Sequence, residues 1–219
     1  MAVDAGTIMN NIRIFNEIIF EQDLDVTYGV ILTKNSHFLP DTEWLTFSEW
    51  DWLNDKSPKR QQNFAWGRAA VRWLCSQLAG VARDEVLISL PSSKEPEVWI
   101  NRNRFYCSIS HSHSKIVILV NQTQRVAVDI EWCRTDRSFA HYQEVFPELQ
   151  PYCSEPEAFY HRWTLLETAA KYNSIPLLDL LGGQELPTHI EVQYLYEQEY
   201  LICTAPAQIP IRWYRFEIP

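Results

Sequence analysis

The chain has 219 residues, which is enough to bury a hydrophobic core as one domain or as two small halves. Hydrophobic residues make up 46% of the sequence and aromatic residues 13%, a composition that excludes an intrinsically disordered protein. The formal net charge of −9 argues against general binding to nucleic acid or anionic membranes, so any phosphate site must be a local basic patch.

The hydrophobic pattern indicates neither a secretory leader nor a membrane-spanning helix. Residues 1–22 lack a basic segment followed by a sustained apolar run, and no apolar run approaches the roughly 18 residues of a membrane span. The five cysteines are scattered, and none forms a C-x-x-C pair. We therefore expect a cytoplasmic protein with reduced thiols, and we expect it to be a monomer.

The first part of the chain predicts a strand and two helices. The strand is expected around Val30 and a short helix over residues 46–54. Ser57 and Pro58 are typical of a helix start, with serine as the N-cap and proline in the first turn. We expect this second helix to end at Gly80.

Strands follow this helix. Short strands are predicted at residues 99–100 and 105–109. Residues 115–120 and 125–132 predict a β-hairpin, with residues 121–124 as its turn.

The second half repeats the order of helix and strands. A long helix is predicted over residues 155–172, and two glycines at 182–183 break the chain after it. The segments 188–196, 199–204 and 209–216 alternate in polarity like antiparallel strands. This order of elements predicts the α+β fold class.

The most informative pattern lies on the long helix. Trp163, Glu167 and Lys171 are spaced by four residues, so their side chains share one side of the helix. A Glu167–Lys171 pair on a surface helix is worth only about 0.2–0.5 kcal/mol and has no functional meaning. Trp163 on the same side indicates that this face is partly buried, which favours a functional role.

Residues 126–132 predict a strand with an apolar face and an acidic face. Asp129 and Glu131 alternate with valine, isoleucine and tryptophan residues. Together with Glu167, these carboxylates could form an oxygen-rich site for a hard divalent cation such as Mg2+. Taken alone, the pair also fits the solvated face of an antiparallel sheet.

Basic residues on the first long helix are candidates for a phosphate site. Lys59, Arg60 and Arg68 lie on it, and Arg60 and Arg68 are about two turns, or ~12 Å, apart. Guanidinium groups suit phosphate recognition. Taken alone, the same residues fit a solvated basic helix face.

His111 and His113 lie in the serine-rich strand that follows. They share one strand face, which is conceivable for a metal pair. No third histidine or cysteine completes such a site, so a hydrogen-bonded histidine is the better interpretation.

These motifs resemble those of the 4′-phosphopantetheinyl transferases, in the surfactin- and enterobactin-type branch. The strand motif reads V-A-V-D-I-E over residues 126–131, and the helix motif reads F-Y-H-R-W-T-L-L-E-T-A-A-K over residues 159–171. Both keep the internal spacing of that family. The runs K-R-Q-Q-N-F-A-W-G-R-A-A, S-S-K-E-P and C-S-I-S-H-S are similar to its basic-helix, lysine and serine–histidine motifs. The resemblance covers about residues 58–172.

The resemblance implies a fold of two similar α+β halves, a pseudo-dimer in which each half is a helix packed on a small antiparallel sheet. The halves would be residues 1–122 and 123–219, with the active site between them. The implied activity is Mg2+-dependent transfer of 4′-phosphopantetheine from coenzyme A to a serine of an apo carrier protein. The carrier belongs to a fatty-acid, polyketide or peptide synthase.

The resemblance also implies roles for individual residues. Metal binding is implied for Asp129, Glu131 and Glu167. Catalytic roles are implied for Glu167, Glu131 and Lys171. Coenzyme A binding is implied for Lys59, Arg60, Arg68, Lys94, Ser110, His111 and Lys171.

Three positions depart from the family pattern and leave two alternatives open. Ala127 and Cys107 stand where the family usually has glycine, and Leu166 where it usually has lysine. Leu166 lies about 100° from Glu167 around the helix, so we expect it at the edge of the functional face. A leucine there opens the alternative of a weakened relative that binds coenzyme A or a carrier protein, although we expect neighbouring basic residues to compensate. The second alternative is an unrelated Mg2+ phosphohydrolase with the same acidic cluster.

Overall fold

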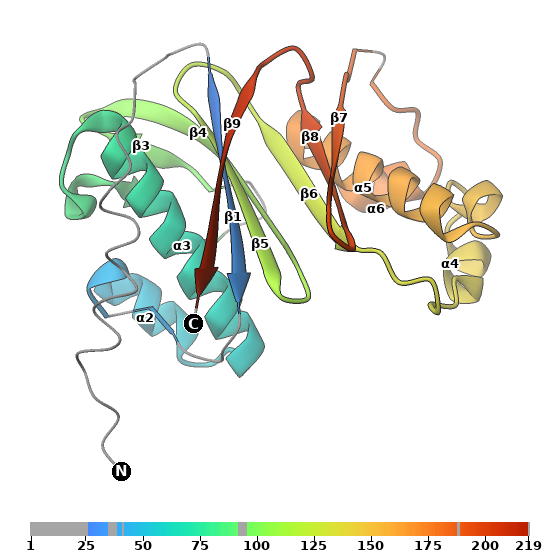
Figure 1. Cartoon of the computed structure of the whole chain (residues 1–219), viewed down its shortest axis with the longest axis horizontal. Coiled ribbons are helices and arrows are strands. Elements are labelled where there is room, and N and C mark those ends of the chain that lie inside the picture. Colours follow the sequence, from blue (N-terminus) through green and yellow to red (C-terminus); the bar gives the residue numbers. More distant parts are fainter. Residues whose placement is uncertain (1–25, 35–38, 41, 92–95, 188, 219) are drawn as a thin grey trace.

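The computed structural model in Figure 1 describes residues 26–34, 39–40, 42–91, 96–187 and 189–218. These residues form a mixed α+β fold with five α-helices and two β-sheets. The predicted fold class is therefore confirmed.

The larger sheet has six strands in the order β2-β3-β4-β5-β1-β9. Their bounds are β1 (Thr27–Lys34), β2 (Leu87–Ile88), β3 (Val98–Ile100), β4 (Asn103–Ser112), β5 (Lys115–Asn121) and β9 (Ile211–Ile218). Neighbouring strands are antiparallel, with the exception of β1 and β9.

The predicted antiparallel direction of the last strand is wrong. β9 runs parallel to β1, with Thr27 opposite Ile211 and Lys34 opposite Ile218. The Thr27 amide donates a hydrogen bond to the Pro210 carbonyl at 3.0 Å, so both strands start at the same end of the sheet. β9 thus belongs to the sheet formed by the first half of the chain, and the division at residues 122 and 123 stays a prediction.

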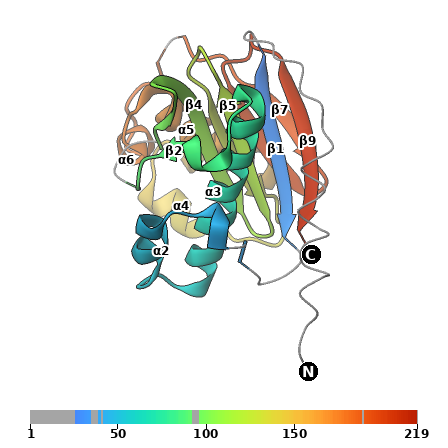
Figure 2. The same ribbon diagram turned by 90° about the vertical axis from the view of Figure 1, so that its left-hand side faces the viewer.

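Helix α3 (Pro58–Ala79) packs against one face of this sheet, as Figure 2 shows. Pro58 stands in its first turn, and Gly80 ends it with a left-handed backbone at φ 64°. Ser57 has the extended backbone of an N-cap, although its side chain makes no capping hydrogen bond among the described residues. Val71 and Leu74 are fully buried in the core between helix and sheet.

The short helix α2 (Phe47–Leu53) precedes α3. Thr46 and Glu49 form a capping box at its start, which explains why the helix begins there. Glu49 is 1% exposed and forms an ion pair with Arg72 at 2.8 Å, so α2 is tied to α3 by a buried charge pair. Single-turn 3-10 helices cover Thr42–Trp44, Arg83–Glu85 and Gln150–Tyr152.

The smaller sheet has three antiparallel strands in the order β6-β8-β7. Their bounds are β6 (Ala127–Trp132), β7 (Gln193–Glu197) and β8 (Tyr200–Ala205). Helix α5 (Pro156–Asn173), the predicted long helix, packs against this sheet and contacts β6 and β8. Two short helices that the sequence did not predict flank it, α4 (Ala140–Val145) and α6 (Leu177–Leu181).

The predicted hairpin of residues 115–120 and 125–132 is wrong. Both edges of β5 are already paired, one with β4 and the other with β1, so no edge remains for β6. The chain leaves the first sheet at Asn121, whose side-chain oxygen accepts hydrogen bonds from the amides of Thr123 and Gln124, each at 2.8 Å. β6 then becomes an edge strand of the second sheet.

The two sheets share a hydrophobic core. Val128 and Ile130 on β6 pack with Ile31 from β1 and with Val117 and Leu119 from β5. Ile31, Val117 and Leu119 lie on the side of the first sheet that faces away from α3. The apolar face predicted for residues 126–132 is therefore buried against the first sheet, and the acidic face is left for α5.

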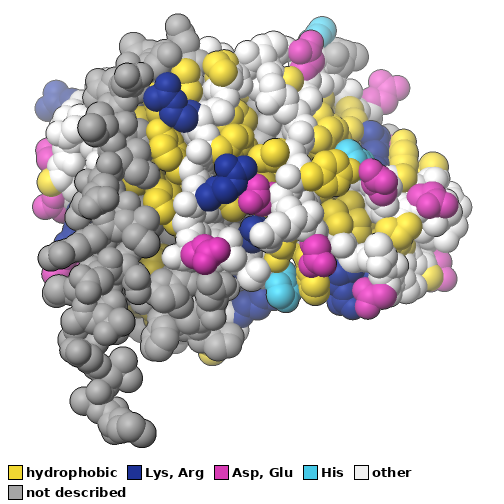
Figure 3. Space-filling view, viewed as in Figure 1, with side chains coloured by type: hydrophobic (Ala, Val, Ile, Leu, Met, Phe, Trp, Pro, Cys, Tyr) yellow, Lys and Arg dark blue, Asp and Glu magenta, His cyan; other side chains and the backbone are white. Residues whose placement is uncertain are grey.

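Charged side chains of both signs are scattered among hydrophobic ones on the face shown in Figure 3.

None of the helices in the described part of the chain has the length and apolar character needed to cross a lipid bilayer.

Candidate functional site

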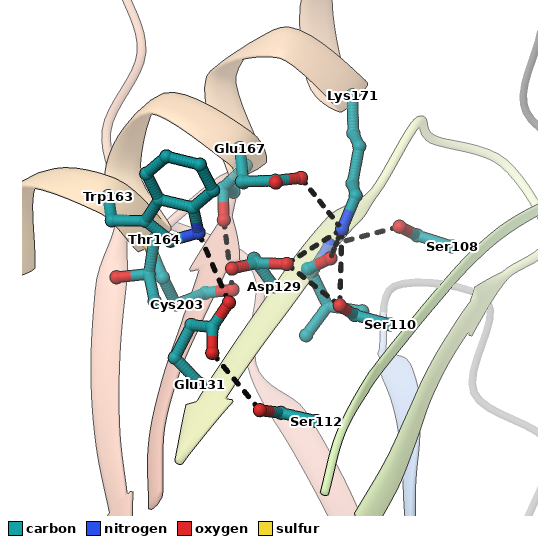
Figure 4. A network of polar contacts seen from close by, with 12 residues as sticks. Ser108, Ser110, Ser112, Asp129, Glu131, Trp163, Thr164, Glu167, Lys171 and Cys203 are labelled. Atoms are coloured by element: carbon teal, nitrogen blue, oxygen red, sulfur yellow. Dashed lines mark hydrogen bonds and ion pairs between the residues drawn. The ribbon is translucent and has the colours of Figure 1, made fainter. Parts of the chain in front are cut away.

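The acidic face of β6 meets the side of α5 that carries Trp163, Glu167 and Lys171 (Figure 4). Trp163 Nε1 donates a hydrogen bond to Glu131 Oε1 at 3.1 Å, and Lys171 Nζ donates one to Asp129 Oδ1 at 2.8 Å. Glu167 lies on the same side, with its Oε2 3.7 Å from Lys171 Nζ. The prediction that Trp163, Glu167 and Lys171 share one side of the helix is confirmed.

Asp129, Glu131, Glu167 and Lys171 form what we call the cluster, and Lys171 lies at its centre. Besides Asp129, its ammonium group donates hydrogen bonds to Ser110 Oγ at 3.2 Å and to the Val128 carbonyl at 3.1 Å. Burial by itself would lower the pKa of Lys171, but the carboxylates of Asp129 and Glu167 outweigh it and raise that pKa. The side chain is 28% exposed, and its charged ammonium group is fixed by these hydrogen bonds.

The glutamates of the cluster hold protons more tightly than ordinary carboxyl groups. Burial and the charge of Asp129 raise the pKa of Glu131 to about 7, although a hydrogen bond from Ser112 works against this rise. Burial and the same aspartate also raise the pKa of Glu167, with Lys171 opposing. The cluster can therefore take up or release a proton near neutral pH.

The raised pKa of Glu131 predicts how the stability of the fold depends on pH. The folded protein binds the Glu131 proton more tightly than the unfolded chain does, because the pKa of Glu131 rises from 4.5 to about 7 on folding. The free energy of unfolding should therefore fall as the pH rises through that window. In EDTA, Glu131→Gln should gain stability relative to the natural protein between about pH 5 and about pH 7.5, measured as the difference in Tm. A difference in Tm that stays constant with pH would contradict the shift.

The carboxylate oxygens of Asp129, Glu131 and Glu167 are of a chemical type that suits a hard cation. Asp129 is 3% exposed, and its Oδ2 is buried without a hydrogen-bond partner among the described residues. The three carboxylates are oxygen ligands of the kind that Mg2+ prefers. In the described part of the chain, however, no group of three or more His, Cys, Asp or Glu side chains is arranged to hold a metal ion. The metal site stays a prediction.

A pocket between α3 and β4 contains part of the predicted basic site. It is lined by Arg60, Arg68 and His111, with Pro96 and the rings of Trp52 and Phe64. Trp52 and Phe64 stack with their centroids 4.6 Å apart. The Arg60 guanidinium lies 5.4 Å from the Trp52 ring, and that of Arg68 lies 4.9 Å from Phe64. An aromatic surface flanked by guanidinium groups suits a ligand with a planar ring and a phosphate.

Arg68 lines this pocket but is almost fully buried. The side chain is 5% exposed, and Nη1 has no hydrogen-bond partner among the described residues. Glu49 Oε1 forms an ion pair with it at 3.8 Å and likewise has no hydrogen-bond partner among the described residues. Glu49 is shared with Arg72, so one carboxylate faces two guanidinium groups, and an anion in the pocket would be favoured.

The remaining predicted residues fall in different places. Successive residues of a strand point to opposite faces, so His111 lines the pocket while Ser110 faces β6 and hydrogen-bonds to Asp129. Lys59 is exposed and does not line the pocket. Lys94 lies outside the described residues.

Sequence reasoning missed Lys34, at the end of β1. Its ammonium group hydrogen-bonds to Asn63, which lines the pocket. Loss of water around the imidazole lowers the pKa of His111, and the charges of Lys34, Lys171 and Lys59 lower it further. These lysines therefore surround His111 with positive charge. A single lysine at a strand end belongs to no motif, so no local spacing could have identified it.

The expected position of Leu166 at the edge of the functional face is wrong. Its side chain is 0% exposed and packs with Leu149, Phe159 and Tyr160 in a third hydrophobic core, which α5 forms with α6 and β8. The rotation of about 100° from Glu167 is enough to carry residue 166 from the cluster into the core. A lysine at this position is therefore expected to be directed into this core and away from the carboxylates.

No model of a known protein family matches the chain, and no curated protein matches its sequence.

Proposed function

We propose that this protein transfers 4′-phosphopantetheine from coenzyme A to a serine of an apo carrier protein and releases 3′,5′-ADP. The observation that carries the proposal is the junction of α5, β6 and β4. One face of β4 contacts a cluster of three carboxylates and Lys171, and the other face lines a pocket with Arg60 and Arg68. A nucleotide with a reactive pyrophosphate needs these two kinds of site close together.

The pocket would bind the 3′-phosphoadenosine end of coenzyme A. The Arg68 guanidinium and the exposed Arg60 would bind phosphate oxygens, and the stacked Trp52 and Phe64 rings offer an apolar surface for the adenine. The positive charge around His111 would attract the phosphates toward the cluster. Lys59 and Lys94 would add to this charge in the proposed complex.

The cluster would carry out the chemistry. The carrier serine attacks the β-phosphorus, a bond to that phosphorus forms, and the bond to the 3′,5′-ADP oxygen breaks. Glu131 or Glu167 accepts the serine proton, for which a pKa near neutrality is suited. Lys171, fixed by its hydrogen bonds, stabilises the negative charge on the leaving group. When bound by Asp129, Glu131 and Glu167, Mg2+ would neutralise the pyrophosphate.

The arrangement of elements supports two similar halves. In each half a long helix, α3 or α5, packs on a sheet, and the proposed site lies where the two sheets meet. The proposed architecture is therefore a pseudo-dimer of two such halves, in which β9 extends the first sheet.

Product analysis tests the proposed function. The protein is incubated with coenzyme A, Mg2+ and a panel of apo carrier proteins from fatty-acid, polyketide and peptide synthases, followed by mass spectrometry of each carrier. Addition of phosphopantetheine to a carrier, with release of 3′,5′-ADP, supports the transferase. Binding of coenzyme A without transfer would favour a weakened relative, and release of free phosphate would favour a phosphohydrolase.

Arg60 offers a test of the pocket. Arg60→Ala should weaken binding of coenzyme A by roughly 10–100-fold in calorimetry, because a charge-assisted hydrogen bond is worth about 1.5–3 kcal/mol. Lys56→Ala is the matched control, since Lys56 also lies over the Trp52 ring, at 4.8 Å, but does not line the pocket. Equal losses of affinity in both variants would mean that only the general positive charge around Trp52 matters.

A further inference from the structure

Three serines alternate along β4 and face the edge of β6. Ser108, Ser110 and Ser112 are spaced by two residues, so their side chains point to the same side of the strand. The Ser108 hydroxyl accepts a hydrogen bond from the Val128 amide at 3.0 Å, and the Ser112 hydroxyl accepts one from the Trp132 amide at 3.0 Å. Serine side chains thus connect β4 to β6 in place of backbone pairing; we call these residues the serine seam.

Two members of the serine seam also bind the carboxylates of the cluster (Figure 4). Ser110 Oγ donates a hydrogen bond to Asp129 Oδ1 at 2.7 Å and accepts one from Lys171 Nζ at 3.2 Å. Ser112 Oγ donates one to Glu131 Oε2 at 3.0 Å. Because each hydroxyl also accepts a hydrogen bond from an N–H group, its own proton is directed at the carboxylate.

These contacts determine where the carboxylates point. Glu131 is held at both oxygens, by Trp163 on one and by Ser112 on the other. Asp129 Oδ1 is held by Ser110 and Lys171, which leaves Oδ2 as the oxygen without a partner among the described residues. The orientation of the second half's cluster therefore depends on side chains from the first sheet.

We propose that Ser110 and Ser112 are positioning residues, which hold Asp129, Lys171 and Glu131 in the geometry that the transfer needs. This inference rests on the proposed function and deepens it, because it assigns the Ser110 hydroxyl to the cluster rather than to coenzyme A. Ser108 has a different role. Among the described residues, it bonds the backbone of β6 and joins the two sheets without a hydrogen bond to a carboxylate.

Kinetic measurements on alanine variants test this assignment. Ser110→Ala and Ser112→Ala should each lower kcat by about 10–100-fold, the usual effect of losing a residue that orients a reacting group, with the KM for coenzyme A within about twofold of the natural value. Ser108→Ala is the matched control, since it loses one seam hydrogen bond and should keep kcat. Ser112→Thr, which retains a hydroxyl, should recover most of the lost rate. A raised KM with unchanged kcat in Ser110→Ala, or equal loss of kcat in all three alanine variants, would overturn the proposal.

A second measurement does not depend on turnover. The Trp163 indole N–H bonds Glu131, so its resonance in a proton–nitrogen NMR spectrum reports on the orientation of that carboxylate. This resonance, assigned with Trp163→Phe, should move in Ser112→Ala and stay in place in Ser108→Ala. A resonance unmoved in Ser112→Ala would overturn the positioning role of Ser112. If the natural protein transfers nothing to any carrier while this shift is seen, the proposed function fails and the positioning role stands.

Discussion

Glu167→Gln is expected to lower the rate of phosphopantetheine transfer by about 10²–10⁴-fold, the range usual for loss of a general acid or base. Glutamine has nearly the same shape but can neither accept a proton nor carry a charge. The Glu167 side chain is 25% exposed and lies 3.7 Å from Lys171, which keeps its main partner in Asp129. The fold should therefore be retained, as checked by circular dichroism and by a Tm close to the natural value.

The control for this variant is Glu157→Gln, near the start of the same helix. Glu157 accepts a hydrogen bond from Tyr196 at an exposed site and makes no contact with the cluster in the described chain. It should keep full transfer activity. If Glu167→Gln retained full activity too, the cluster would not carry the chemistry, and the transferase proposal would lose its central observation.

Leu166→Lys is expected to destabilise the protein by at least about 4 kcal/mol, which lowers the Tm of a domain of this size by roughly 8–16 °C. The substitution removes a fully buried leucine from the third core, between α5, α6 and β8, and places an amine there without a partner. Transfer activity should not rise, because the new side chain lies on the wrong side of α5. Thermal unfolding followed by circular dichroism measures the effect.

Leu165→Lys is the matched control. Leu165 is the preceding residue on α5, is only partly buried, and lines a surface pocket beside Tyr152 and Tyr194. Its replacement should cost much less stability. A similar Tm for the two variants would show that the side chain at position 166 can reach solvent, and would restore the expectation that this position contributes to the functional face.

Local patterns in the sequence determined the elements that carry the site. The spacing of four residues on α5 brings Trp163, Glu167 and Lys171 to one side, and the alternation along β6 separates its apolar face from Asp129 and Glu131. Such relations depend only on the helical and strand periods, so they can be read without knowledge of the fold. The ends of α3 were equally local, because the backbone preferences of Pro58 and Gly80 act within one turn.

Only the tertiary structure decided how these elements come together. β6 leaves β5 because β1 and β4 occupy both edges of that strand, and β9 returns to pair with β1 in parallel. Every strand presents the same repeating backbone donors and acceptors, whichever strand pairs with it. The alternation of apolar and polar residues therefore predicts a strand, but not which strand lies beside it or whether the pair is parallel or antiparallel.

The same limit applies to the site. The spacing of the serines on β4 was visible in the sequence, but their contacts with Asp129 and Glu131 exist only because two sheets meet there. For Leu166, the helical period alone gave its angle around α5 relative to Glu167, but not whether it is buried. Which side of α5 is buried depends on the residues packed against it, and these come from elsewhere in the chain.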